Sequence, residues 1–179
     1  MWNLLLTALY FMLPAYFANM APVISRSFFK GLNNPLDFNK TIGGKPILGK
    51  NKTFRGLIFG ILFAIIIAFV QSMFYNAGMF MNLTILDYNK WMLIGLLMGT
   101  GAIFGDAFKS FLKRRIGIMP GNPMIIFDQI DYALGTIIFM LPIIVLKIEM
   151  IIMIILTSLI LNILINHISF YLKIRNEKW

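Results

Sequence analysis

The chain has 179 residues, of which 59% are hydrophobic, and it carries a formal charge of +9 at pH 7. Its mean hydropathy of +0.82 is too high for a soluble domain of this size. In the sequence of a soluble domain, the core residues form periodic apolar stripes and not long apolar runs. The absence of Cys excludes disulfides, thiolate metal sites and Cys nucleophiles, and a single His excludes a cluster of His ligands. We therefore expect an all-α integral membrane protein.

Five predominantly apolar runs approach or reach the length of roughly 20 residues that a membrane-spanning helix needs. They lie at about residues 2–22, 57–75, 91–108, 124–146 and 150–172. No signal-peptide cleavage pattern is evident near the N-terminus. These runs predict a single membrane-embedded domain over residues 1–179, a multi-pass protein of the cell membrane with two polar loops.

The positions of the basic residues predict the topology of these spans. All of the 16 Lys and Arg residues lie in residues 23–55, in residues 109–115 or in the C-terminal tail, except Lys90 and Lys147. Cations are enriched in loops on the cytoplasmic side of membranes. We therefore expect the N-terminus outside, the C-terminus in the cytoplasm, and both polar loops on the cytoplasmic side.

The first polar loop ends in a basic segment, residues 45–56 (KPILGKNKTFRG). Glycines next to basic side chains allow backbone N–H groups and cations to surround phosphates. The spacing of a P-loop is absent, and the same residues would also suit anionic lipid headgroups. The candidate phosphate-binding residues here are Lys45, Lys50, Lys52, Thr53 and Arg55.

The third span leads into the second polar loop. Gly95, Gly99 and Ala102 fall on one helical stripe with Asp106, which predicts close packing of this face within the protein. The Gly and Pro residues of residues 116–123 cannot continue a helix and predict the turn into the fourth span. The residues that share one face at the end of the third span, within an arc of about 100°, are Asp106, Lys109, Ser110 and Lys113.

Three carboxylates flank this turn. Asp128 and Asp131 are three residues apart, so both lie on one face of the fourth span, and Asp106 lies at the end of the third. Placing a carboxylate within a bilayer costs about 2.5–3.5 kcal/mol of free energy, so we expect each of these residues to serve a function. Ion pairing at a helix start is the structural explanation, but the set also suits Mg²⁺, which takes oxygen ligands and substrate phosphates. We favour metal or substrate binding, although residues 113–115 alone are typical of a topology anchor.

Other polar residues of the spans have simpler interpretations. Asn19 lies where the first span reaches the cytoplasmic face, where it would line the site or serve in packing. Pro142 predicts a kink in the fourth span, and His167 predicts a packed or interfacial side chain. A polar stripe on the fifth span predicts hydrogen bonds between helices in preference to substrate contacts, and comprises Ser158, Asn162, Asn166 and Ser169.

Motifs over nearly the whole chain resemble those of the CDP-archaeol synthase family, the archaeal CTP-dependent cytidylyltransferases of ether-lipid synthesis. The most specific part is a Ser, a Lys-Arg pair and then Asp-x-x-Asp. The related bacterial CDP-diacylglycerol synthases are longer and differ before the first Asp, so the FDQID form and the five spans favour the archaeal branch. The matching segments are residues 14–23 (PAYFANMAPV), 35–38 (PLDF), 48–56 (LGxxKTxRG), 105–115 (GDxxKSxxKRR), 120–121 (PG) and 127–131 (FDQID).

The resemblance implies transfer of CMP from CTP to 2,3-bis-O-(geranylgeranyl)-sn-glycerol 1-phosphate, with release of pyrophosphate. It implies Mg²⁺ bound by Asp106, Asp128 and Asp131, with Lys109 also in the catalytic centre. CTP, this isoprenoid ether lipid and the membrane are the expected partners; no nucleic acid is expected, and a homodimer is left open. The residues implied in binding the triphosphate and the lipid phosphate are Lys45, Lys50, Lys52, Thr53, Arg55, Ser110, Lys113, Arg114 and Arg115.

Several other functions compete with this one. A cytidylyltransferase acting on phosphatidic acid would use the same residues. A CDP-alcohol phosphatidyltransferase would carry a D-G-x-x-A-R segment, which is absent. A small ion-coupled transporter would place its charges near the middle of the membrane, and a non-catalytic binder of anionic lipids leaves the three Asp residues unexplained.

Overall fold

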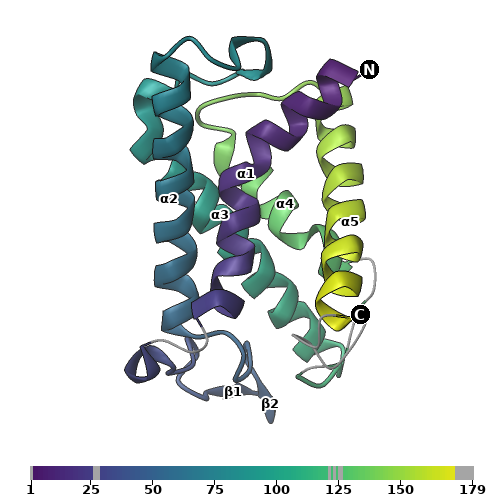
Figure 1. Cartoon of the computed structure of the whole chain (residues 1–179). Coiled ribbons are helices and arrows are strands. Elements are labelled where there is room, and N and C mark those ends of the chain that lie inside the picture. The colour runs from purple at the N-terminus through teal and green to yellow at the C-terminus, as the bar shows by residue number, and fades with distance from the viewer. Residues whose placement is uncertain (1, 26–28, 121, 123, 125–126, 172–179) are drawn as a thin grey trace.

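The computed structural model describes residues 2–25, 29–120, 122, 124 and 127–171. Arg26 and the tail cations Lys173, Arg175 and Lys178 lie outside these residues. The described residues form a bundle of α-helices with a small two-stranded hairpin at one end (Figure 1). The α-helices are α1 (Trp2–Ile24), α2 (Phe54–Asn76), α3 (Trp91–Arg115), α4 (Phe127–Met140) and α5 (Ile148–Tyr171).

In Figure 1, α1 lies in front, between α2 and α5, while α3 and α4 lie behind it. The most extensive helix pairings join α3 to α4, α2 to α3 and α1 to α2. The start of α1 and the end of α5 lie at opposite ends of the bundle. α3 is therefore the central element, and the hairpin lies at the end of the bundle where α3 finishes.

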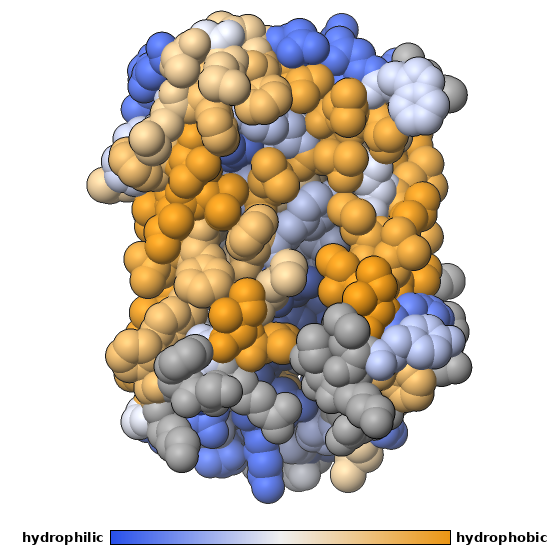
Figure 2. Space-filling model, viewed as in Figure 1, coloured by the Kyte–Doolittle hydropathy of each residue, from blue (hydrophilic) through white to orange (hydrophobic). Residues whose placement is uncertain are grey.

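Four of the described helices are long and apolar enough to cross a membrane: Trp2–Ile24, Phe54–Asn76, Tyr88–Arg115 and Ile148–Ile168. In Figure 2 apolar side chains flank both sides of the middle of this face, with a strip of more hydrophilic side chains between them, and hydrophilic side chains gather at its two ends. An apolar girdle of this kind is suited to the hydrocarbon core, where the backbone groups of a helix are satisfied within the helix. The predicted membrane protein is confirmed.

The fourth apolar run differs from its prediction. A span was expected over about residues 124–146, but α4 has 14 residues, which corresponds to about 21 Å at 1.5 Å per residue. Pro142 does not kink the helix, because α4 has already ended at Met140. Pro142 has no N–H to extend the helix, and the N–H groups of Ile143 and Ile144 instead both donate to the Met140 carbonyl, at 2.9 and 3.0 Å.

Glycines allow α3 to contact both of its neighbours closely. A Cβ on Gly95 or Gly99 would come within 3 Å of the α2 backbone, so the predicted stripe of small residues is packed against α2. A second stripe, which was not predicted, faces α4: a Cβ on Gly105 would overlap the Asp131 carbonyl, and a Cβ on Gly135 would overlap the Gly101 carbonyl. α3 and α4 therefore pack backbone against backbone.

The loop between α1 and α2 is folded into a defined structure. It contains a 3₁₀ turn (Lys30–Leu32) and the strands β1 (Thr41–Ile42) and β2 (Lys45–Pro46), which pair antiparallel with Thr41 opposite Pro46. Gly43 and Gly44 have positive φ angles, as a two-residue hairpin turn of type I′ requires. The loop closes where the Leu36 N–H donates to the Lys52 carbonyl at 2.7 Å. On the opposite end, two further 3₁₀ turns (Met81–Leu83 and Tyr88–Lys90) join α2 to α3.

Candidate active site

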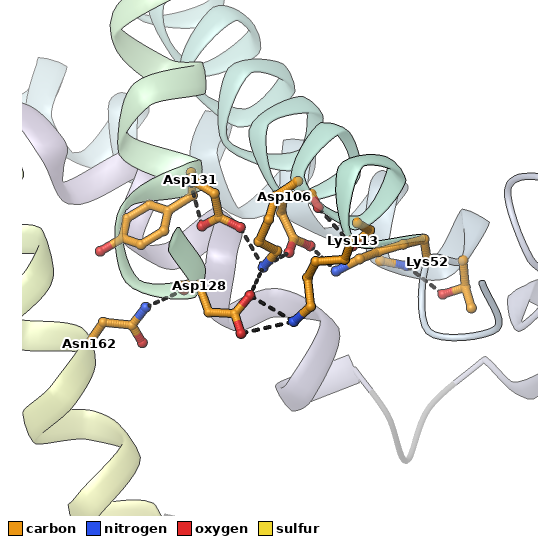
Figure 3. Close-up of polar contacts among 11 residues, drawn as sticks. Lys52, Asp106, Lys113, Asp128, Asp131 and Asn162 are labelled. Carbon is orange, nitrogen blue, oxygen red and sulfur yellow. Dashed lines mark hydrogen bonds and ion pairs between the residues drawn. The ribbon is translucent and has the colours of Figure 1, made fainter. Parts of the chain in front are cut away.

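Three carboxylates converge on one ammonium group near the C-terminal end of α3. Lys109 Nζ lies 3.0 Å from Asp106 Oδ1, 3.0 Å from Asp128 Oδ1 and 2.6 Å from Asp131 Oδ2. Figure 3 shows the carboxylates of Asp106, Asp128 and Asp131 turned toward one another. The structure therefore brings together the four residues that the sequence analysis placed in the catalytic centre.

The glycine contact between α3 and α4 produces this convergence. Gly105 packs against the carbonyl of Asp131, so the residue that follows it, Asp106, lies beside the first turns of α4. Asp128 and Asp131 share one face of those turns. α3 and α4 thus both supply carboxylates to one point.

Two further lysines complete the cluster. Lys113 Nζ lies 3.0 Å from Asp128 Oδ2, and Lys52, from the loop between α1 and α2, pairs with Asp106 Oδ2. The side chain of Asp131 is only 6% exposed, whereas those of Asp106 and Asp128 are 21% and 22% exposed. Three ammonium groups thus pair with three carboxylates, and Asp106 and Asp128 are the more exposed of the carboxylates. We call these residues the charge cluster: Lys52, Lys109, Lys113, Asp106, Asp128 and Asp131.

Backbone and amide groups hold the α4 carboxylates in place. Asp128 Oδ2 accepts a hydrogen bond from the Met124 N–H at 2.6 Å, and Asp131 Oδ1 accepts one from the Tyr132 N–H at 2.7 Å. Asn162 of α5 donates to the Asp128 carbonyl at 3.2 Å. α5 therefore supports the site through the backbone of α4.

The oxygen donors of the cluster suit Mg²⁺, which prefers carboxylates, water and phosphates. Asp131 Oδ2 is buried, and its partner in the described part of the chain is the Lys109 ammonium, 2.6 Å away. Among the described residues, however, no three acidic, His or Cys side chains are already arranged around a metal position. Lys109 lies among the carboxylates, so metal binding at this point requires its ammonium to move aside.

Several predicted substrate-binding residues make local contacts. Thr53 caps α2, because its hydroxyl accepts a hydrogen bond from the Gly56 N–H at 3.2 Å. The buried Ser110 hydroxyl donates to the Asp106 carbonyl at 2.9 Å within α3. Arg114 is also buried, and its guanidinium donates to the Ile118 carbonyl just beyond the helix. These contacts stabilise the elements that carry the charge cluster.

The other predicted cations lie around the cluster. Lys50 is exposed on the loop, and Arg55 is buried in the first turn of α2. The exposed Lys45 donates to the Arg115 carbonyl at 3.2 Å. Arg115 itself donates to backbone carbonyls of the hairpin. Of the predicted phosphate-binding lysines, Lys52 and Lys113 thus belong to the charge cluster, whereas Lys45 does not.

Asp37 organises the loop, a role that the sequence analysis missed. Its carboxylate accepts hydrogen bonds from the N–H groups of Leu48 at 2.8 Å, Gly49 at 2.9 Å and Asn39 at 3.0 Å. Burial alone would raise the pKa of Asp37, but these N–H donors outweigh it and hold the pKa below its usual value. The signal available in the sequence was a single acidic residue within a strongly basic loop.

The polar stripe of α5 confirms the prediction of hydrogen bonds between helices. The Tyr132 hydroxyl of α4 donates to the Ser158 carbonyl at 3.3 Å, and the Tyr16 hydroxyl of α1 lies 3.4 Å from Ser158 Oγ. His167 contacts the Ile163 carbonyl of its own helix at 2.8 Å. The side chain of Ser169 lies outside the described residues.

Comparison with known proteins gives one consistent result. Residues 1–179 match the family described as CarS-like, CDP-archaeol synthase. The chain is 34% identical over 183 residues to the CDP-archaeol synthase of Methanocaldococcus jannaschii, covering 99% of each protein, and 31% identical over 179 residues to that of Methanococcus aeolicus, covering 98% of this chain and 97% of the relative.

A solved structure, described as that of an intramembrane enzyme for archaeal membrane lipids biosynthesis, is similar with a TM-score of 0.75. It is 25% identical in sequence, and the match covers 89% of this chain and 92% of that one. Sequence and fold thus agree over almost the full length. The chain belongs to the CDP-archaeol synthase family.

Proposed function

We propose that this protein transfers CMP from CTP to 2,3-bis-O-(geranylgeranyl)-sn-glycerol 1-phosphate, forming unsaturated CDP-archaeol and pyrophosphate at the cell membrane. The observation that carries the proposal is the charge cluster at one end of an apolar bundle. Ammonium groups suit phosphates and carboxylates suit a divalent cation, so one site offers partners for both parts of a metal–nucleotide complex. The relatives named CDP-archaeol synthase support the same reaction.

In this reaction an oxygen of the lipid phosphate attacks the α-phosphorus of CTP. The bond between the α-phosphorus and the oxygen bridging to the β-phosphorus breaks, and pyrophosphate leaves with that electron pair. The attacking oxygen is already ionised near neutral pH, so the site needs no general base. The protein therefore acts through alignment and through neutralisation of phosphate charge.

The residues of the charge cluster divide into two roles. Lys52, Lys109 and Lys113 would exchange their carboxylate partners for phosphate oxygens of CTP and of the lipid. Asp106, Asp128 and Asp131 would hold Mg²⁺, which supplies polarisation of the α-phosphate and pyrophosphate oxygens when bound. Because the lysines and the carboxylates satisfy one another in the free protein, we expect CTP and Mg²⁺ to bind much more tightly together than either does alone.

The same proposal includes a five-pass topology with the N-terminus outside. α4 together with residues 141–147 would form the additional crossing, although α4 alone is shorter than the roughly 30 Å hydrocarbon core. The distribution of Lys and Arg supports this orientation. The charge cluster and the hairpin would then face the cytoplasm, where CTP is available.

The direct test is incubation of the purified protein with radiolabelled CTP, Mg²⁺ and either the geranylgeranyl ether phosphate or phosphatidic acid. We expect labelled CDP-lipid and pyrophosphate with the ether lipid. Turnover of neither lipid would contradict the enzyme assignment. Turnover of phosphatidic acid alone would show that the substrate is a diacyl lipid.

Substitution of the acidic residues tests the metal assignment. We expect Asp128→Asn and Asp131→Asn each to reduce turnover at least about 100-fold, because each removes a carboxylate placed to hold Mg²⁺. Asp87→Asn is the matched control, since Asp87 is exposed at the opposite end of the bundle and accepts a hydrogen bond from the Asn89 N–H. Near-full activity in either site variant would show that its carboxylate is not a required ligand.

A further inference from the structure

Arg115, the last residue of α3, contacts the backbone of the hairpin. Its Nη1 donates to the Ile42 carbonyl at 2.8 Å, and its Nη2 donates to the carbonyls of Pro46 at 2.6 Å and Lys45 at 3.2 Å. Both terminal nitrogens of the guanidinium thus bind carbonyl oxygens from the two strands. The planar, multidentate donor set of Arg is suited to this arrangement in a way that a Lys ammonium is not.

The contact between α3 and the hairpin is reciprocal. Lys45 Nζ donates back to the Arg115 carbonyl at 3.2 Å, so each of the two residues binds the backbone of the other. The Arg115 guanidinium also lies over the ring of Phe111, one turn earlier in α3, with its Cζ 5.3 Å from the ring centroid. A cation over an aromatic face at this distance is attracted to the ring, which orients the guanidinium before it meets the hairpin.

The hairpin is connected to the charge cluster by a short, braced segment. The Ile47 N–H donates to the Lys40 carbonyl at 3.1 Å, and the next two N–H groups, of Leu48 and Gly49, donate to Asp37. Three residues further on, the ammonium of Lys52 pairs with Asp106. A fixed hairpin therefore limits where Lys52 can lie relative to α3.

We propose that Arg115 is a positioning residue, which clamps the hairpin to the end of α3 and thereby sets Lys52 against Asp106. In the sequence analysis, the family resemblance instead implied that Arg115 binds a phosphate. With both terminal nitrogens on hairpin carbonyls, Arg115 would have to release the hairpin to bind a phosphate. The clamp stands on the hydrogen bonds of the free protein, whereas its effect on turnover rests on the proposed function.

The absence of Cys allows a direct test with the full chain in detergent. A nitroxide attached to Thr41→Cys, on the exposed side of β1, reports hairpin mobility by electron paramagnetic resonance. We expect Arg115→Ala to increase this mobility without any substrate, and Arg115→Lys to restore part of the immobilisation. Lys40→Ala, which removes an exposed cation from the same loop, should leave the spectrum unchanged.

The nitroxide at Thr41→Cys also distinguishes two roles of Arg115, a clamp on the hairpin and a ligand of a CTP phosphate. For a clamp, adding Mg²⁺ and CTP to the otherwise unchanged labelled protein leaves the hairpin immobile. An unchanged spectrum in Arg115→Ala, or release of the hairpin by Mg²⁺ and CTP to the extent seen in Arg115→Ala, would overturn the proposal. These measurements need no turnover, so they judge the clamp even if the proposed reaction fails.

Kinetics test the link from Arg115 to Lys52. We expect Arg115→Ala to lower turnover about 10- to 100-fold, because a small misplacement of a binding group has this effect. If Arg115 acts through Lys52, the double variant Arg115→Ala/Lys52→Ala is no slower than Lys52→Ala alone. Multiplicative losses would show that Arg115 has a separate role, such as a phosphate contact of its own.

Discussion

Lys109 lies at the centre of the site. Lys109→Met should destabilise the protein by about 3–5 kcal/mol, because three partly or fully buried carboxylates lose a shared partner. If these carboxylates also bind Mg²⁺, the metal should raise the melting temperature of Lys109→Met more than that of the unsubstituted protein. Thermal unfolding in EDTA and in Mg²⁺ measures both effects, and Lys109→Arg serves as the charge-conserving control. An equal response to Mg²⁺ in all three proteins would place the metal elsewhere.

Asp37 predicts how the loop responds to pH. Because the folded pKa of Asp37 lies below its usual value, its contribution to loop stability is complete above the unfolded pKa of about 3.9. That contribution is lost as the pH falls through the lower, folded pKa. We therefore expect the mobility of a nitroxide at Thr41→Cys to be constant from pH 5 to pH 8 and to rise only in stronger acid.

The variant Asp37→Asn tests the same hydrogen bonds at neutral pH. It removes charge-assisted hydrogen bonds of a kind worth about 1.5–3 kcal/mol. Faster hydrogen exchange at the amides of Leu48 and Gly49 would follow at pH 7. A mobility transition near pH 6 in the labelled protein, or unchanged exchange in Asp37→Asn, would show that another group holds the loop.

Only part of the site can be recognised from the sequence. Asp106, Asp128 and Asp131 are recognisable because carboxylates beside apolar runs are costly and helical spacing groups them. The contacts of Arg115 are not recognisable, because its partners are backbone carbonyls about 70 positions earlier, which carry no side-chain signature. Asp37 was missed for the same reason, since its partners are backbone N–H groups.

The contact between α3 and α4 decides whether the site forms. Gly105→Ala would push α4 away, because the new Cβ would overlap the Asp131 carbonyl. We expect this variant to lose most of its turnover and part of its stability, measured by CTP turnover and by thermal unfolding. Gly31→Ala is the matched control, because a Cβ there meets no atom within 4 Å. Turnover within about twofold of the unsubstituted protein in Gly105→Ala would contradict a rigid contact.

Helix ends were harder to predict than helix cores. The apolar runs locate all five α-helices, yet α3 continues to Arg115, seven residues beyond the expected end, because its last turns bury polar side chains against the loop and α4. α4 ends early, because Pro142 cannot donate to a continuing helix. Hydropathy reports contact with lipid, so it is silent about helix that is covered by protein.

The proposed five-pass arrangement predicts which positions can be reached from each side of the membrane. Thr41→Cys on the hairpin and Asn82→Cys in the turn between α2 and α3 are both exposed and lie at opposite ends of the bundle (Figure 1). In intact cells, a membrane-impermeant maleimide should label Asn82→Cys and spare Thr41→Cys until the membrane is opened. The reverse pattern would invert the proposed orientation.

The charge cluster contains equal numbers of ammonium and carboxylate groups, and this balance affects how CTP reaches the site from solution. Six charges that sum to zero have no net monopole, so their field falls off with distance faster than that of a single charge and attracts an anion in solution only weakly. Long-range attraction of CTP then falls to exposed loop cations such as Lys45 and Lys50, whose potential is screened within about 8 Å at physiological ionic strength. Salt should therefore slow the capture of CTP far more than it slows the conversion of CTP that is already bound.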